Sequence, residues 1–182
     1  MPAVIDRGAG ALPTDDVVEL ILADHREFEE LIRDLRNRGE DRPAKLADLA
    51  DLLVAHAEAE EAVVYPQLQR EAPDEAEDIT HGAEEHADGH VALLALLRAS
   101  EEDNDTFEAA LEELSRTVMH HLDEEERDVL NAARENAPDG VRAELGRAFR
   151  DRRATLLVSH PGTRRNVERL VEAARRQGLL HD

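Results

Sequence analysis

Residues 46–70 read LADLADLLVAHAEAEEAVVYPQLQR, and this stretch decides the fold class. Its apolar residues recur every three or four positions, the spacing that places side chains on one face of an α-helix. One histidine and one glutamate, His56 and Glu60, lie on that same apolar face. Because Pro43 suits the first turn of a helix, we predict one long helix from about residue 43 to residue 70.

Three further stretches of the same kind predict three more long helices. One covers about residues 15–37 and is predicted to be capped by Thr14. The others cover about residues 73–100 and 103–137, the last with its cap in the segment Asp103–Thr106. Ala, Leu, Glu and Arg dominate, and no stretch alternates like a strand, so the chain is predicted to be all-α. Short loops between four long helices predict an up-down-up-down four-helix bundle.

A C-terminal helical extension follows this region. Residues 138–182 hold two shorter amphipathic segments, over about 141–150 and 163–177. The extension is basic, because residues 141–182 carry ten Arg against five acidic residues, whereas the whole chain has a formal charge of −21. We therefore predict a bundle over residues 14–137 and a basic extension that packs on the bundle, on a second copy in a homodimer, or on a protein partner.

Composition excludes several classes of function. The chain has no Cys, which rules out disulfides, thiolate nucleophiles and zinc-finger or iron–sulfur ligation. The charge of −21 repels nucleic acid and anionic lipid, so no nucleic acid and no membrane is expected as a partner. The first ten residues lack the apolar core of a signal peptide, and no run is long enough to span a bilayer, so we expect a cytoplasmic protein.

The chain repeats itself internally. With a shift of 65 residues, the pair His56 and Glu60 overlays on the pair His121 and Glu125, and the apolar residues around both pairs also match. A periodic helix can match itself by chance, but chance does not also align two His-x-x-x-Glu pairs. The repeat therefore predicts two helical hairpins related by a pseudo-twofold axis.

Side chains of the metal-ligand type lie on the apolar stripes of all four predicted helices. They are His25, His56, Glu60, His86, His90, His121 and Glu125. The same shift overlays His25 on His90 but leaves His86 without a counterpart. A lone histidine on such a stripe is usually a hydrogen-bonded core residue, and a buried carboxylate is costly unless it is compensated. The symmetric set instead predicts two metal ions about 3.5–4 Å apart, with Fe, Zn and Cu as the metals that imidazole suits.

The set resembles the motifs of the hemerythrin-like, or HHE cation-binding, family. The stretches that carry the resemblance are Asp24–His25, His56–Glu61 with Tyr65–Pro66, Glu85–His86 with His90, and His121–Glu126. The resemblance covers about residues 15–137. Ferritin-like di-iron proteins use Glu-x-x-His pairs instead, whereas here the histidine comes first and the glutamate four residues later.

The resemblance implies a non-heme di-iron centre with two Fe ions and an oxo or hydroxo bridge. It assigns His86, His90 and His121 to one iron, His25 and His56 to the other, and Glu60 and Glu125 to both. The second iron then has an open position, where the family binds O2, NO, peroxide or small anions. Tyr65, five residues after Glu60, is predicted to reach this cofactor as a hydrogen-bond donor or to pack at a helix end. The remaining histidines are predicted to be solvated: His81, His120, His160 and His181.

Three functions are compatible with these residues. The first is a di-iron protein that binds or reacts with O2, NO or peroxide at the open iron position. The second is a catalase-like enzyme that decomposes peroxide, so that enzymatic activity stays open. The third is an iron- or oxygen-sensing interaction protein that signals through the basic C-terminal extension. A pure oxygen carrier is disfavoured, because carrier hemerythrins place an Asp five residues after the last histidine where this chain has Glu125 at four, and because Trp is absent and Phe scarce.

Overall fold

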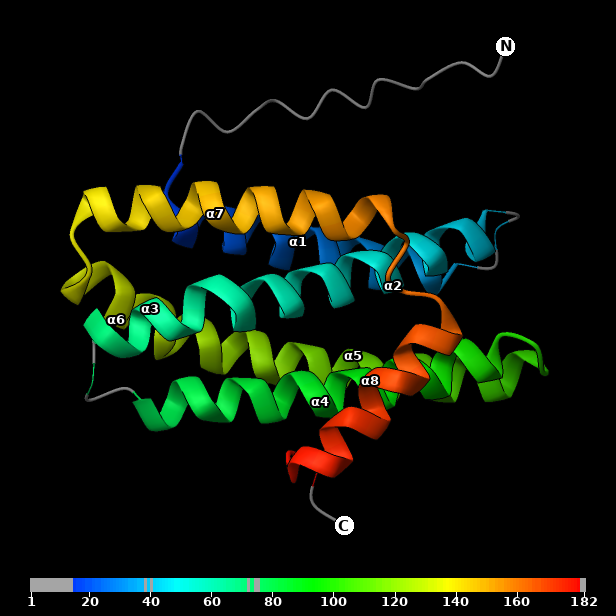
Figure 1. The fold of residues 1–182 in the computed structure, drawn as a ribbon. Coiled ribbons are helices and arrows are strands. Elements are labelled where there is room, and N and C mark those ends of the chain that lie inside the picture. Colours follow the sequence, from blue (N-terminus) through cyan, green and yellow to red (C-terminus); the bar gives the residue numbers. More distant parts are fainter. Residues whose placement is uncertain (1–14, 38, 40, 72, 74–75, 181–182) are drawn as a thin grey trace.

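The computed structural model describes residues 15–180 apart from residues 38, 40, 72, 74 and 75. Within this part the chain is helical and has no β-strand, which confirms the all-α prediction. The bundle consists of α1 (Val17–Leu35), α2 (Arg42–Ala59), η1 (Glu60–Val64), α3 (Tyr65–Glu71), α4 (Ala76–Ala99), α5 (Asn104–Arg127) and α6 (Val129–Asn136). Figure 1 shows α1, α2, α4 and α5 side by side with alternating directions, so the up-down-up-down arrangement is also confirmed.

Two of the predicted long helices are not continuous. The helix predicted over residues 43–70 is interrupted by the π-helical turn η1 between α2 and α3, and the fourth helix is broken at Asp128. Local signals still place the starts: Asp103 caps α5, as predicted, by accepting hydrogen bonds from two N–H groups of the first turn at 3.0 Å. The side chain of Asp16 caps α1 at 2.9 Å. The predicted cap Thr14 lies outside the described residues.

The apolar core of the bundle consists of two clusters. One gathers around Phe28, Leu49, Leu93 and Leu114, and the other around Ile21 and the residues packed on it near η1 and α6. In α1, α2–η1, α4 and α5–α6, one cluster supplies apolar residues toward one end and the other cluster supplies them toward the other end, with the buried histidines and glutamates in the middle. Burial of one Leu, Ile or Phe side chain stabilises the fold by about 1.5–3 kcal/mol. The two apolar clusters therefore supply the stabilisation that keeps the polar layer buried between them.

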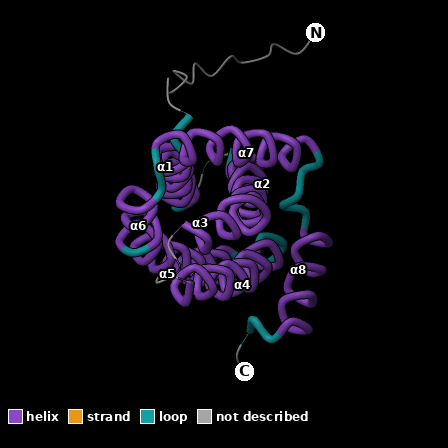
Figure 2. Tube along the Cα trace, turned by 60° about the vertical axis from the view of Figure 1, so that its left-hand side comes forward, coloured by secondary structure: helices purple, strands orange, loops and turns teal. Residues whose placement is uncertain are grey.

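The C-terminal extension forms α7 (Asp139–Val158) and α8 (Arg164–Gln177). The first is longer than the segment predicted over 141–150, and Figures 1 and 2 show it lying along α1 and α2, while α8 lies against α4. Each helix shares an apolar cluster with the bundle: Phe149 of α7 is 1% exposed in one cluster, and Val167 of α8 is fully buried in the other. The extension is therefore part of the packed core.

Glycine permits the close approach of α7 to the bundle. A Cβ atom on Gly146 would lie 1.6 Å from the carbonyl oxygen of Asp15, so no other residue fits there without a backbone shift. Basic residues of α7 also bind acidic residues of the bundle: Arg142 contacts Asp16 at 2.8 Å, and Arg150 contacts Asp15.

Among the described helices, none has the combined length and apolarity that crossing a bilayer requires.

Candidate metal centre

All seven predicted ligands lie in the polar layer between the two apolar clusters. Each is at most 8% exposed, and Glu60 is fully buried. Among the described residues, the other buried side chains with a polar group are Asp24, Ser115 and Tyr65. The seven come from α1, α2, η1, α4 and α5, so every long helix of the bundle contributes to one point in the core.

The inward-facing atoms of this layer have no hydrogen-bond partners. These atoms are the Nε2 atoms of all five histidines, Oε1 of Glu60 and Oε2 of Glu125. They crowd one another nonetheless: Nε2 of His25 lies 3.2 Å from Glu125, and Nε2 of His56 lies 3.3 Å from Glu60. A buried polar atom without a partner costs about 1–3 kcal/mol, so this convergent set of lone pairs fits metal ions that would accept them.

Groups of three ligand atoms lie within 4.8 Å of one another, and they overlap. The groups are His25–His56–Glu125, His56–Glu60–His86 and Glu60–His121–Glu125. His90 belongs to none of them, but it lines a cavity of about 30 Å³ together with His56, His86 and His121. The structure thus gathers six of the predicted ligands into overlapping groups of three and places His90 at the wall of the adjoining cavity.

Carboxylates hold the outer nitrogen of four of the five imidazoles. The Nδ1 contacts are His25 to Glu126 at 2.7 Å, His56 to Asp24 at 3.0 Å, His86 to Glu61 at 2.9 Å and His121 to Glu85 at 2.9 Å. A carboxylate accepts the Nδ1–H proton, which fixes the tautomer and leaves the Nε2 lone pair free for a metal. The sequence showed these acids as motif residues of the family resemblance but did not assign them a histidine partner; each is the chain neighbour of a predicted ligand.

These contacts revise the register of the internal repeat. His25 and His86 each bond, through Nδ1, the acid that follows a glutamate of the other hairpin, and their Nε2 atoms each lie 3.2 Å from that glutamate. Asp24 and Glu85, the residues directly before them, make equivalent contacts with the other two histidines. The structure therefore pairs His25 with His86, not with His90 as the 65-residue shift predicted. His90 is the histidine without a counterpart.

The π-helical turn brings Tyr65 to the centre. Residues five apart are roughly 140° apart around an α-helix, whereas a π-turn with its i to i+5 hydrogen bond places them one above the other. The Tyr65 backbone N–H accordingly donates to the carbonyl of Glu60. The Tyr65 hydroxyl lies 3.0 Å from Glu125 and 3.3 Å from Glu60, and the ring stacks on His86. Burial and the two glutamates raise the pKa of Tyr65 well above its usual value, so the hydroxyl stays a donor.

Without metal, the layer is strongly polarised. Burial by itself would lower the pKa of His25 and of His86, but their carboxylate partners raise those pKa values to about 9 and about 10. Burial and the neighbouring His86 lower the pKa of His90 to about 4. Burial would raise the pKa of Glu125, yet the close contact with His25 and the charges of the nearby imidazoles lower it. The carboxylates therefore favour a cation at this point.

A sequence model of one family matches most of this bundle. The family is described as hemerythrin HHE cation binding domain, and the match covers residues 16–133. The chain belongs to the hemerythrin HHE family. No curated protein and no solved structure gives a match. All seven predicted ligands of this hemerythrin HHE domain, together with Tyr65, lie inside the matched range.

Helix α7 lies outside the matched HHE range and yet covers one side of the candidate centre. Phe149 meets the ring of His56 edge-on at 5.8 Å, and Phe28 does so from α1 at 5.0 Å. Arg153 binds both carboxylate oxygens of Asp24 at 2.7 Å, and Asp24 in turn holds Nδ1 of His56 at 3.0 Å. Scarcity of Phe is one reason why the sequence disfavours a pure oxygen carrier, but two of the three Phe residues of the chain lie against this one histidine.

The described histidines that were predicted to be solvated lie outside the inner layer. His81, His120 and His160 are exposed, and His181 lies outside the described residues. His160 binds Asp51 at 2.7 Å in the turn between α7 and α8. His81 and His120 lie near carboxylates of α4 and α5 on the outer surface of the bundle.

Proposed function

We propose that this HHE-domain protein is a non-heme di-iron protein that binds or reacts with O2, NO or peroxide. The observation that carries the proposal is the convergence of buried imidazole and carboxylate atoms without hydrogen-bond partners, in a chain of a cation-binding family. Imidazole with hard carboxylate oxygen suits iron. The proposed ligands are His86, His90 and His121 for one ion, His25 and His56 for the other, and Glu60 and Glu125 for both.

Iron bound there would supply redox chemistry and a Lewis-acidic position for a small ligand. Residues of the chain orient the side chains around that position. The outer carboxylates hold the imidazoles in one tautomer and one orientation. Tyr65 keeps a protonated hydroxyl between Glu60 and Glu125, where it restrains both carboxylates and can donate a hydrogen bond.

The walls of the layer favour a ligand of two or three atoms over a larger substrate. Phe28 and Phe149 pack edge-on against His56 and make that wall of the layer apolar. The adjoining cavity measures about 30 Å³, which has room for about two water molecules at the roughly 10–15 Å³ that each needs. Because His25 and His56 are two imidazoles against three for the other ion, the proposed open position is on their side.

Metal content and anion binding test the proposal together. After expression with iron, we expect about two irons per chain by elemental analysis. Azide added to the oxidised protein should produce a ligand-to-metal charge-transfer band in the visible. One metal or none per chain would refute the di-iron assignment. Two irons with no azide response would mean that both ions are saturated, which would remove the small-ligand function but keep the metal site.

A second candidate function is sensing through the C-terminal extension. The contact from Arg153 through Asp24 to His56 favours it, because it connects α7 directly to a proposed iron ligand. Sensing predicts that hydrogen exchange in α7 differs between iron-loaded and metal-free protein, while the solvated end of α8 stays unchanged. Rapid decomposition of hydrogen peroxide by the iron-loaded protein would instead assign an enzymatic function.

A further inference from the structure

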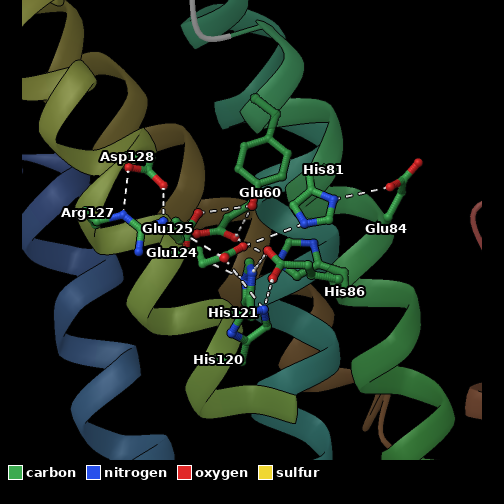
Figure 3. A network of polar contacts seen from close by, with 12 residues as sticks. Glu60, His81, Glu84, His86, His120, His121, Glu124, Glu125, Arg127 and Asp128 are labelled. Carbon is green, nitrogen blue, oxygen red and sulfur yellow. Dashed lines mark hydrogen bonds and ion pairs between the residues drawn. The ribbon is translucent and has the colours of Figure 1, made fainter.

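A second cluster of metal-ligand side chains lies on the outer surface of α4 and α5, beside the inner layer (Figure 3). His81, Glu85 and Glu124 each offer one atom within 4.8 Å of the other two. Nε2 of His81 lies 3.6 Å from Glu124, and Nε2 of His120 lies 3.6 Å from Glu124 and 3.9 Å from Glu85. The imidazoles of His81 and His120 are 54% and 65% exposed, so a solvated ion can reach them.

Glu85 connects this surface cluster to the inner layer. Its side chain is only 10% exposed, and its Oε1 atom is buried without a hydrogen-bond partner on the side of His120. Its Oε2 atom lies 2.9 Å from Nδ1 of His121, one of the proposed inner ligands. A buried carboxylate oxygen without a partner is costly, and a cation held by the surface cluster would compensate it.

A small cavity continues from the cluster toward the inner layer. His81 and Glu124 line it on the solvent side, and the buried Tyr65 and Glu125 line it on the inner side. Its volume of about 20 Å³ has room for about one water molecule, and a divalent ion without its hydration shell is smaller. Gly82 also lines the cavity, and a Cβ atom there would lie 2.8 Å from the Tyr65 hydroxyl. Glycine at this position therefore leaves space for the tyrosine.

We propose that His81, Glu85 and Glu124 form a loading site, at which a divalent first-row metal ion binds before it passes beside Tyr65 to the inner centre. The inference rests on the proposed function, because it assumes that the inner layer binds metal. One imidazole and two carboxylates form a mixed set that suits Fe²⁺, Mn²⁺ or Zn²⁺. The chain's charge of −21 attracts cations over the whole surface, and this cluster concentrates them at the mouth of a cavity whose far wall includes a proposed ligand, Glu125.

The rate of Co²⁺ uptake tests the loading site. Metal-free protein is mixed with Co²⁺, uptake is followed by visible absorption, and the final metal content is measured separately. The variants are His81→Ala and Glu124→Gln, and the control is His160→Ala, which removes another exposed histidine on a carboxylate. We expect both variants to take up the ion at least about tenfold more slowly than the control, with the same final content.

Zn²⁺ titration of the iron-loaded protein tests the site directly. One additional Zn²⁺ should bind to wild type and to His160→Ala and should be lost in His81→Ala. Uptake as fast as in the control, or Zn²⁺ binding that survives both variants, would overturn the proposal. A lower final metal content in His81→Ala would also overturn it, because His81 would then belong to the inner centre. A wild-type protein that binds no inner metal would instead defeat the proposed function, and this is visible before any variant is compared.

Discussion

Arg153 is expected to control the affinity of one inner metal ion from outside the family domain. Its guanidinium binds both oxygens of Asp24 at 2.7 Å, and Asp24 holds Nδ1 of His56 at 3.0 Å. The substitution Arg153→Met keeps most of the apolar stem and removes the charge and both hydrogen bonds. Asp24, whose side chain is 7% exposed, then keeps its contact with His56 but loses the guanidinium that compensates its charge.

The expected magnitude follows from burial. Removal of one partner from a fully buried ion pair costs about 3–5 kcal/mol. Arg153 is 22% exposed, so water can partly replace it, and we expect a loss of about 2–3 kcal/mol in the free energy of unfolding of the metal-free protein. Removal of a group that orients a metal ligand typically costs about 10–100-fold in metal affinity. This loss should affect the ion on His25 and His56 and leave the other ion in place.

Urea unfolding and chelator competition measure the two effects. The matched control is Arg152→Met, which removes the same charge from the next residue of α7, where the side chain is exposed. We expect the control to change stability by less than about 0.5 kcal/mol and to keep both metal affinities. If Arg153→Met unfolds and releases metal in the same way as Arg152→Met, then α7 covers the centre without influencing it, and the coupling from Arg153 to His56 is refuted.

Three further outcomes are expected. Because each glutamate contacts ligands of both ions, Glu60→Ala and Glu125→Ala should each reduce the bound metal below one ion per chain by elemental analysis. The control His160→Ala should keep the wild-type content, and a glutamate variant that retains two ions would contradict the shared role. Removal of metal should lower the melting temperature, since a ligand present at 1,000 times its Kd adds about 4 kcal/mol to the native state; equal melting temperatures would show that the inner atoms are solvated. Gly146→Ala should destabilise the fold by about 1–3 kcal/mol in urea unfolding, since its Cβ would lie 1.6 Å from the Asp15 carbonyl. A stabilised Gly146→Ala variant would instead mean that α7 shifts freely on the bundle.

Helical periodicity alone determined much of this protein. Polar residues on an otherwise apolar stripe must lie inside a bundle, so the seven ligand-type residues could be placed in the core before any tertiary contact was known. All seven are buried in one layer. The same local logic identified Asp103 as a cap, because a capping side chain bonds N–H groups two and three residues away.

Distances between helices and local departures from helical geometry cannot be predicted from periodicity, and only the tertiary structure determined them. A repeat found by sliding the sequence aligned His25 with His90, but interhelical contacts align it with His86. In a uniform α-helix Tyr65 would point away from Glu60, but the π-turn points it inward. The spacing of apolar residues does not predict such a turn. The sequence predicted a basic extension that packs on the bundle, on a second copy or on a partner, and only the packing of α7 on α1 and α2 brought Arg153 to Asp24. The period of a helix fixes which face a side chain occupies, whereas the side chain that it meets across the core depends on packing between segments far apart in the chain.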